Sequence, residues 1–183
     1  MKVQLINKPT LEYTDWAIGE CYNKGTYCDQ EKRDNRIKKV ALKHKHSSVL
    51  EFTNFVFEIE ASCKVLLEMT RHRQASYACK STRYTLNKGM INFEKTGNPH
   101  VDEAIESWLE VILDFIDAGV SNEITSLMLP QAYTYKWVVQ FNARSLINFF
   151  ELRRAKSAHF QIREVAEEMY NQIPQEMKYL FDG

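Results

Sequence analysis

The segment from Arg71 to Tyr84, RHRQASYACKSTRY, contains five cationic side chains, counting His72, and no acid. It also contains three Ser or Thr hydroxyls and two tyrosines. Guanidinium forks match the oxygens of a phosphate, and hydroxyls can occupy the remaining acceptor positions. The segment therefore predicts a site for a nucleotide phosphate. The alternative is that these cations only end a helix, where they offset the negative end of the helix dipole.

A second polar group falls on a helix that is predicted to begin at Asn142. Arg144 and Asn148 are four residues apart and so share one helical face, while apolar residues between them anchor the other face. Such a face can hold a planar polar ligand, or it can simply be exposed to water.

Three other side chains allow proton transfer or nucleophilic attack. His46 and His72 can titrate near neutral pH, although an isolated histidine more often has a structural role. Cys79 lies near arginines that would lower the pKa of its thiol, which makes it the candidate nucleophile. A free cysteine is, however, usually an unreactive side chain that only packs against its neighbours.

Secondary structure must bring these groups together. The alternation in FTNFVFEIEA predicts a strand over 52–61, and Ser62 can cap a helix that ends at Arg71. The fifteen residues after Arg73 lack a helical stripe, so we expect a loop or an irregular extended segment. Further strands are expected at 3–6, near Met90–Phe93 and at 134–140, and further helices after Pro9 and Thr10, at 29–45, at 101–118, from Asn122 to before Pro130, from Asn142 and at 157–173. Apolar residues expected to be buried in these helices include Trp16, Phe115 and Phe160.

The bulk properties limit the classes of protein. The 183 residues have a formal net charge of zero, and their composition is that of an ordered protein. Without repeats or linkers, they predict one α+β domain over 1–183, with a small central antiparallel or mixed sheet flanked by helices. No CxxC pair, signal segment or long apolar run occurs, so we expect a cytoplasmic protein that has no metal site and does not bind a membrane.

Three segments resemble the flavin-dependent thymidylate synthase family. RHRQASYACKSTRY matches seven of the nine fixed positions of the family signature RHRxxSxNExSxRY. HSSVLEF, at 46–52, is similar to the HxSxxEH element, with Phe52 in place of the last His. NARSLINFFELR, at 142–153, is similar to the family helix NARSLxNFxxLR. Together they cover residues 46–153.

The resemblance implies a homotetramer with sites shared between subunits. It implies binding of FAD, dUMP or a related pyrimidine nucleotide, and methylenetetrahydrofolate, with NADPH as the usual reductant of the flavin. The reaction would convert dUMP to dTMP without a cysteine nucleophile. The implied cofactor-binding residues are His46, Ser48, Glu51, Arg71, His72, Arg73, Asn142, Arg144 and Asn148. The implied substrate-binding residues are Glu68, Arg71, Ser81, Thr82, Arg83 and Arg153, and Arg153 is also the catalytic cation that stabilises charge on the pyrimidine ring.

The chain departs from the family pattern at several positions. Ala78 and Cys79 replace the Asn-Glu pair of the signature. Ser126 stands where many members have a phosphate-binding arginine, a loss for which Lys80 or Lys136 could compensate. Glu68 stands where Gln is common and, three residues before Arg71, could pair with that arginine.

Other functions remain open at this point. An enzyme of the same cofactors could modify another pyrimidine nucleotide or add hydroxymethyl in place of methyl. A non-catalytic tetramer could bind flavin or nucleotide only, although retention of Arg153 weighs against that. Nucleic-acid binding by the basic segments at 35–50 and 69–93 has no support from the net charge, and we expect none.

Overall fold

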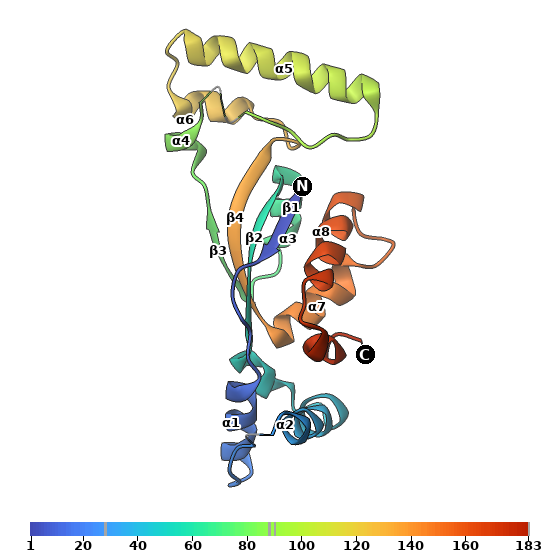
Figure 1. The fold of residues 1–183 in the computed structure, drawn as a ribbon. Coiled ribbons are helices and arrows are strands. Elements are labelled where there is room, and N and C mark those ends of the chain that lie inside the picture. Colours follow the sequence, from blue (N-terminus) through green and yellow to red (C-terminus); the bar gives the residue numbers. More distant parts are fainter. Residues whose placement is uncertain (28, 88, 90, 183) are drawn as a thin grey trace.

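The structure is a computed structural model that describes residues 1–27, 29–87, 89 and 91–182. It is elongated, with a sheet in the middle and helices at both ends (Figure 1). In chain order, its elements are β1 (Lys2–Leu5), α1 (Glu12–Cys21), α2 (Gln30–Ile37), the π-helix η1 (Lys38–Lys43), the 3-10 helix η2 (Ser47–Phe52), β2 (Asn54–Ser62), α3 (Cys63–Met69), β3 (Ala75–Cys79), α4 (Thr82–Thr85), α5 (Pro99–Asp117), α6 (Asn122–Thr125), the 3-10 helix η4 (Ser126–Met128), β4 (Thr134–Asn142), α7 (Ala143–Arg153), α8 (Phe160–Asn171) and the 3-10 helix η5 (Gln175–Leu180).

The four strands form one antiparallel sheet in the order β1-β2-β4-β3. This confirms the predicted α+β class and selects the antiparallel form of the sheet. The two long central strands pair along their whole length, from Asn54 opposite Asn142 to Ser62 opposite Thr134. The start of β2 and the end of β4 therefore lie together at one end of the sheet.

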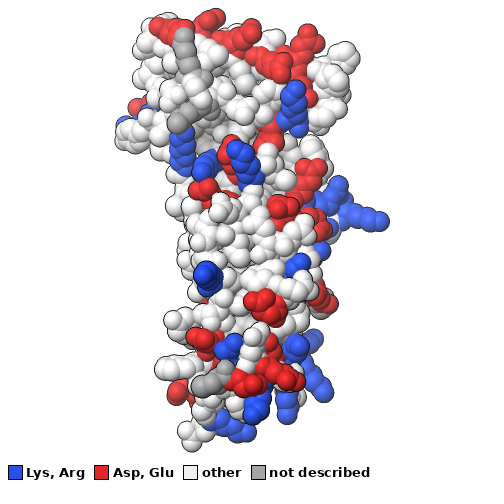
Figure 2. Space-filling model, viewed as in Figure 1, with Lys and Arg blue, Asp and Glu red and all other residues white. Residues whose placement is uncertain are grey.

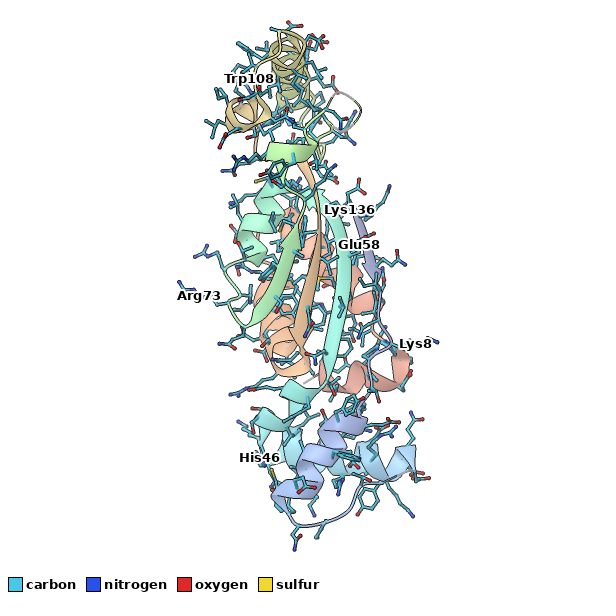
Figure 3. The ribbon with its side chains drawn as sticks, turned by 90° about the vertical axis from the view of Figure 1, so that its left-hand side faces the viewer. Lys8, His46, Glu58, Arg73, Trp108 and Lys136 are labelled. Atoms are coloured by element: carbon cyan, nitrogen blue, oxygen red, sulfur yellow. The ribbon has the colours of Figure 1, made fainter. Side chains whose placement is uncertain are left out.

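One face of the sheet forms the core. Phe55, Phe57 and Ile59 of β2 are fully buried, as their alternation with polar residues predicts. The inward residues of β4 join them, namely Trp137, Val139 and Phe141. Helices α7 and α8 cover this face, while no helix of the described residues lies on the opposite face (Figures 1 and 3).

Both central strands lead directly into a capped helix. The Ser62 hydroxyl accepts a hydrogen bond from the Val65 amide, which starts α3 as predicted. The Asn142 side-chain oxygen accepts one from the Ser145 amide at 2.8 Å and starts α7. Because the strands are antiparallel, these helices begin at opposite ends of the sheet.

The segment after Arg73 corrects one prediction. Residues 75–79, expected to be irregular, form the edge strand β3, and 82–85 form the short helix α4. Strand β3 pairs with β4 from Ala75 opposite Phe141 to Cys79 opposite Trp137. The strand near Met90–Phe93 is only partly testable, since Met90 lies outside the described residues and Phe93 makes an isolated bridge to Tyr133.

Three aromatic side chains that were expected to be buried are exposed. The exposed fractions are 63% for Trp16, 42% for Phe115 and 39% for Phe160. For Phe115 the reason is the position of α5, which lies beyond one end of the sheet and packs mainly on α6 (Figure 1). An amphipathic pattern identifies the apolar face of a helix, but it does not say whether another element covers it.

The charges are interspersed over the face seen in Figure 2, with acidic side chains along α5. The described part of this face has no continuous basic surface. Among the described helices, none is long and apolar enough to span a bilayer.

Candidate functional site

A cleft of about 1020 Å³ lies at the end of the sheet where β2 begins and β4 ends. Strand β3 also begins at this end, because Ala75 pairs with Phe141. The sheet register thus brings together the residues that precede β2, precede β3 and follow β4. Eight predicted site residues line the cleft, namely Glu51, Arg71, His72, Arg73, Asn142, Arg144, Asn148 and Arg153.

The wall formed by α7 presents the polar face that the sequence predicts. Arg144 and Asn148 line the cleft, and Arg144 Nη1 donates to Glu51 Oε1 at 2.7 Å. Both members of this ion pair are about half exposed, at 52% and 48% of their side chains. A ligand can therefore reach them from solvent. Asn142 uses its side-chain oxygen as the N-cap of α7, which leaves its NH2 group as the donor for a ligand.

The opposite wall contains the arginines of the signature. Arg71 is 73% exposed, and its distance of 3.8 Å from Glu68 makes only a loose ion pair. Arg73 has no ion pair among the described residues, and it extends outwards from the edge of the sheet (Figure 3). These two guanidinium groups are the positive charges that remain most available to an anion.

Arg153 is held much more tightly than the other cations. Its Nε donates to His72 Nε2, its Nη1 to Glu68 Oε2 and its Nη2 to the Glu68 carbonyl oxygen, each at 2.9 Å. Only 16% of the Arg153 and Glu68 side chains is exposed. Glu68 thus contacts two arginines, and its contact with Arg71, three residues further along the chain, is weaker than its contact with Arg153.

Apart from Glu68, which contacts Arg153 but does not line the cleft, five predicted residues lie elsewhere. His46 and Ser48 lie at the start of η2, and the His46 ring packs edge-on against Tyr22, away from the lining of the cleft (Figure 3). The other three, Ser81, Thr82 and Arg83, lie at the far end of β3, whose five residues span roughly 17 Å at ~3.3 Å per residue.

At that far end, Thr82 lines a second cleft of about 270 Å³ together with Lys80, Tyr135 and Lys136. Arg83 lies 3.7 Å from Glu123 and stacks over the Tyr84 ring. Within one chain, the two ends of the signature therefore face different cavities.

Comparison with known proteins bears on what these cavities hold. The sequence profile described as "Thymidylate synthase complementing protein" matches residues 9–177. The flavin-dependent thymidylate synthase of Campylobacter jejuni is 34% identical over 200 residues, which cover 100% of this chain and 96% of the relative. The chain belongs to the flavin-dependent thymidylate synthase family. The resemblance seen in the three motifs is thereby confirmed.

Other members of the family agree in sequence and in fold. The flavin-dependent thymidylate synthase of Wolinella succinogenes is 32% identical and covers 99% of this chain and 97% of its own. The crystal structure of thymidylate synthase X from Helicobacter pylori with FAD and dUMP superposes with a TM-score of 0.90 at 27% identity. That superposition covers 100% of this chain and 98% of the other.

Three positions where the chain departs from the family pattern, Ala78, Cys79 and Ser126, lie outside the lining of the large cleft. Ala78 and Cys79 pair with Val138 and Trp137 towards the far end of β3. Desolvation raises the pKa of the Cys79 thiol, so the neutral thiol is favoured and a nucleophilic role is not supported. The Ser126 hydroxyl donates to the Glu123 carbonyl oxygen.

The cleft also contains residues that the motifs did not identify. Gln74 and Ser157 line it without belonging to the fixed positions of any motif. Ser145 lines it too; it is a fixed position of the NARSLxNFxxLR element to which no binding role was assigned, and the helical periodicity of α7 could have indicated one.

The protonation state of His72 follows from its contacts. Burial lowers its pKa, and the charges of Arg153 and Arg71 lower it further, to about 4. Because His72 Nε2 accepts from Arg153, the ring hydrogen must reside on Nδ1. At neutral pH, His72 is therefore a neutral hydrogen-bond donor towards a ligand and an acceptor towards Arg153.

This arrangement predicts a pH-dependent stability. The folded state disfavours protonated His72, whereas the unfolded chain takes up the proton near the ordinary pKa of ~6.5. The contribution of neutral His72 is therefore complete above pH 6.5 and is lost as the pH falls from there towards 4. His72→Gln keeps an acceptor for Arg153 but cannot titrate, so its urea-unfolding free energy should fall less over this range than that of the unmodified protein. Parallel pH profiles of the two proteins would contradict the assignment.

Proposed function

We propose that the chain methylates dUMP to dTMP, with methylenetetrahydrofolate as the carbon donor, FAD as the hydride carrier and NADPH as the reductant. The observation that carries this proposal is the convergence of three separated family motifs on one cleft. The relatives are named flavin-dependent thymidylate synthases, and the Helicobacter pylori structures contain FAD and dUMP. Methylenetetrahydrofolate and NADPH rest on the family resemblance.

The large cleft is suited to FAD. Its volume of about 1020 Å³ reaches the upper end of the ~300–1,000 Å³ range of ligand pockets, as a dinucleotide requires. Arg71 and Arg73 can pair with the pyrophosphate, since Arg71 is 73% exposed and only loosely paired with Glu68, and Arg73 has no ion pair among the described residues. Glu51, His72, Asn142, Arg144 and Asn148 provide donors and acceptors for the polar edges of the ring systems. When bound there, FAD supplies the hydride of the reaction.

Arg153 has the role of the catalytic cation. The pyrimidine C5 becomes nucleophilic only as negative charge develops on the ring, and a fixed positive charge stabilises that state more than the ground state. The two-sided attachment of Arg153 to Glu68 and His72 keeps its guanidinium in place without reorganisation.

In this proposal, Ser81, Thr82 and Arg83 bind the phosphate end of the nucleotide. Because they lie beyond β3 from the cleft of their own chain, we propose that a neighbouring subunit supplies them and that the protein is a homotetramer. His46 and Ser48 are kept as cofactor residues of such a shared site.

The surface supports this assembly. Large apolar side chains are exposed on α5, α6 and η4 at one end of the molecule, namely Trp108, Val111, Phe115, Ile124 and Leu127. In the part of the chain that the structure describes, no helix covers the sheet face opposite α7 and α8 (Figure 3). The free thiols of Cys21, Cys63 and Cys79 fit a reducing compartment, and we place the reaction in the cytoplasm.

The product of the reaction tests the proposal. The purified protein is incubated with FAD, NADPH, methylenetetrahydrofolate and dUMP, and the nucleotide is identified by mass. We expect dTMP, and none when the folate or the flavin is omitted. A hydroxymethylated nucleotide, or no product while flavin is bound, would contradict the proposed reaction.

A further inference from the structure

Glu68 occupies a position that helix stability does not explain. It lies in the last turn of α3, where the negative end of the helix dipole disfavours an acid. Only 16% of its side chain is exposed, so its charge also loses hydration. Its partners must therefore account for its presence.

Those partners are all cations. Lys64 lies 3.0 Å from one carboxylate oxygen, while Arg153 at 2.9 Å and Arg71 at 3.8 Å approach the other. The hydrogen bond from Lys64, with the charges of Lys64, Arg153 and Arg71, lowers the pKa of Glu68. The carboxylate is thus ionised at neutral pH, when it accepts hydrogen bonds and donates none. It would repel the phosphate of a nucleotide.

Glu68 contacts Arg153 through two acceptors, its carboxylate and its backbone carbonyl oxygen. The Glu68 carboxylate binds Nη1, and the Glu68 carbonyl oxygen binds Nη2, while His72 binds Nε. Three of the five N–H groups of the guanidinium are then occupied within the described chain. Three acceptors around one planar group fix its orientation, and two N–H groups remain for a ligand.

The backbone that carries these acceptors is itself held. The Tyr77 hydroxyl lies 2.7 Å from the Met69 carbonyl oxygen and 3.0 Å from the His72 carbonyl oxygen. The His72 ring also packs edge-on against Phe149 of α7, with 5.0 Å between ring centroids. The turn between α3 and β3 therefore keeps Glu68 and His72 in fixed relative positions on either side of Arg153.

We propose that Glu68 is a positioning residue of the reaction, which fixes the Arg153 guanidinium so that its two remaining N–H groups meet the pyrimidine. This inference rests on the proposed function, and it gives Glu68 a role other than direct contact with the nucleotide. A carboxylate is suited to this role because it holds a guanidinium more strongly than a neutral amide does.

Kinetics of Glu68→Ala, Glu68→Gln and Lys64→Met test the proposal. Misplacing a catalytic group by ~1 Å costs on the order of 100-fold in rate, so Glu68→Ala should lower kcat about 10- to 100-fold. The KM for dUMP should stay within about threefold, because no direct contact is lost. Glu68→Gln should recover part of the loss, since its amide oxygen can still accept from Nη1. Lys64→Met removes a partner of the same carboxylate without touching Arg153, and it should retain the unmodified kcat.

A second measurement does not depend on turnover. In Glu68→Ala, Arg153 is no longer held beside His72, so the part of the lowering that the Arg153 charge causes should be lost. The His72 pKa measured by NMR titration should then rise above about 4 but stay below its ordinary value, because burial, the largest cause, remains. In Lys64→Met it should stay low. If Glu68→Ala raises KM at unchanged kcat, or leaves the His72 titration unchanged, the positioning role is wrong. If the unmodified protein makes no dTMP, the proposed function fails, and the titration still decides whether Glu68 holds Arg153.

Discussion

Arg153→Ala should lower the rate of dTMP formation by about 10²- to 10³-fold, the loss expected when a preorganised charge is removed from a transition state. Flavin binding should persist, because the remaining cleft residues are unchanged. The variant should also fold, since Glu68 keeps its contact with Lys64. Single-turnover product formation and flavin absorbance measure the two effects separately.

The neighbouring arginine provides a matched control. Arg154 follows Arg153 on the chain, but it stacks on Tyr170 and pairs with Glu167 outside the cleft. Arg154→Ala should therefore retain turnover. Arg153→Lys keeps the charge but loses the fork that reaches both Glu68 and His72, so it should recover little activity. Unchanged turnover in Arg153→Ala would remove this residue from the mechanism.

Arg36→Met should lower the free energy of unfolding by about 3–5 kcal/mol, because it leaves a buried carboxylate without its cation. Asp15 is only 1% exposed, and it accepts from Arg36 Nε at 2.7 Å. Arg36 also donates to the carbonyl oxygens of Gly25 and Asp15, and it stacks on Tyr27. These contacts join α1 to α2, and α1 packs on η2, which carries Glu51. Urea unfolding measures the loss.

Two control variants distinguish the loss of the buried Asp15–Arg36 ion pair from the loss of a surface charge. Lys2→Met removes a cation whose partner, Glu60, is 3.9 Å away at the surface, and its effect should be much smaller. The double variant Asp15→Leu with Arg36→Met leaves no unpaired charge, so it should cost less than Arg36→Met alone. If the double variant loses as much unfolding free energy as Asp15→Leu and Arg36→Met lose together, the loss comes from packing and not from an unpaired charge.

The parts of the fold that sequence predicted are those with a local signal. Strand β2 alternates over its own residues, and Asn142 and Ser62 act as caps within three residues of themselves. Strand β3 has no such signal, because it is defined by pairing with β4, which lies more than fifty residues further along the chain. The exposure of Trp16 and Phe115 likewise depends on what packs against each helix.

The same distinction applies to the site. The motifs predicted eight of the residues that line the cleft, because a motif specifies residue types at fixed spacing, but they did not show that Ser81, Thr82 and Arg83 lie at the far end of β3. They did not predict that Glu68 meets Arg153, since 85 residues separate the two along the chain. Nor could they give the tautomer of His72, which depends on the direction from which Arg153 approaches.

The paired ends of β2 and β4 have a consequence for which parts of the molecule can vary. These ends shape the large cleft, and they continue directly into the buried layer of the sheet. Drift of the backbone there would disturb folding itself. Ala78 and Cys79 instead lie on the edge strand β3, and Ser126 lies in the short 3-10 helix η4. Change of the backbone is thus least constrained at these peripheral positions, while the large cleft takes its shape from the core.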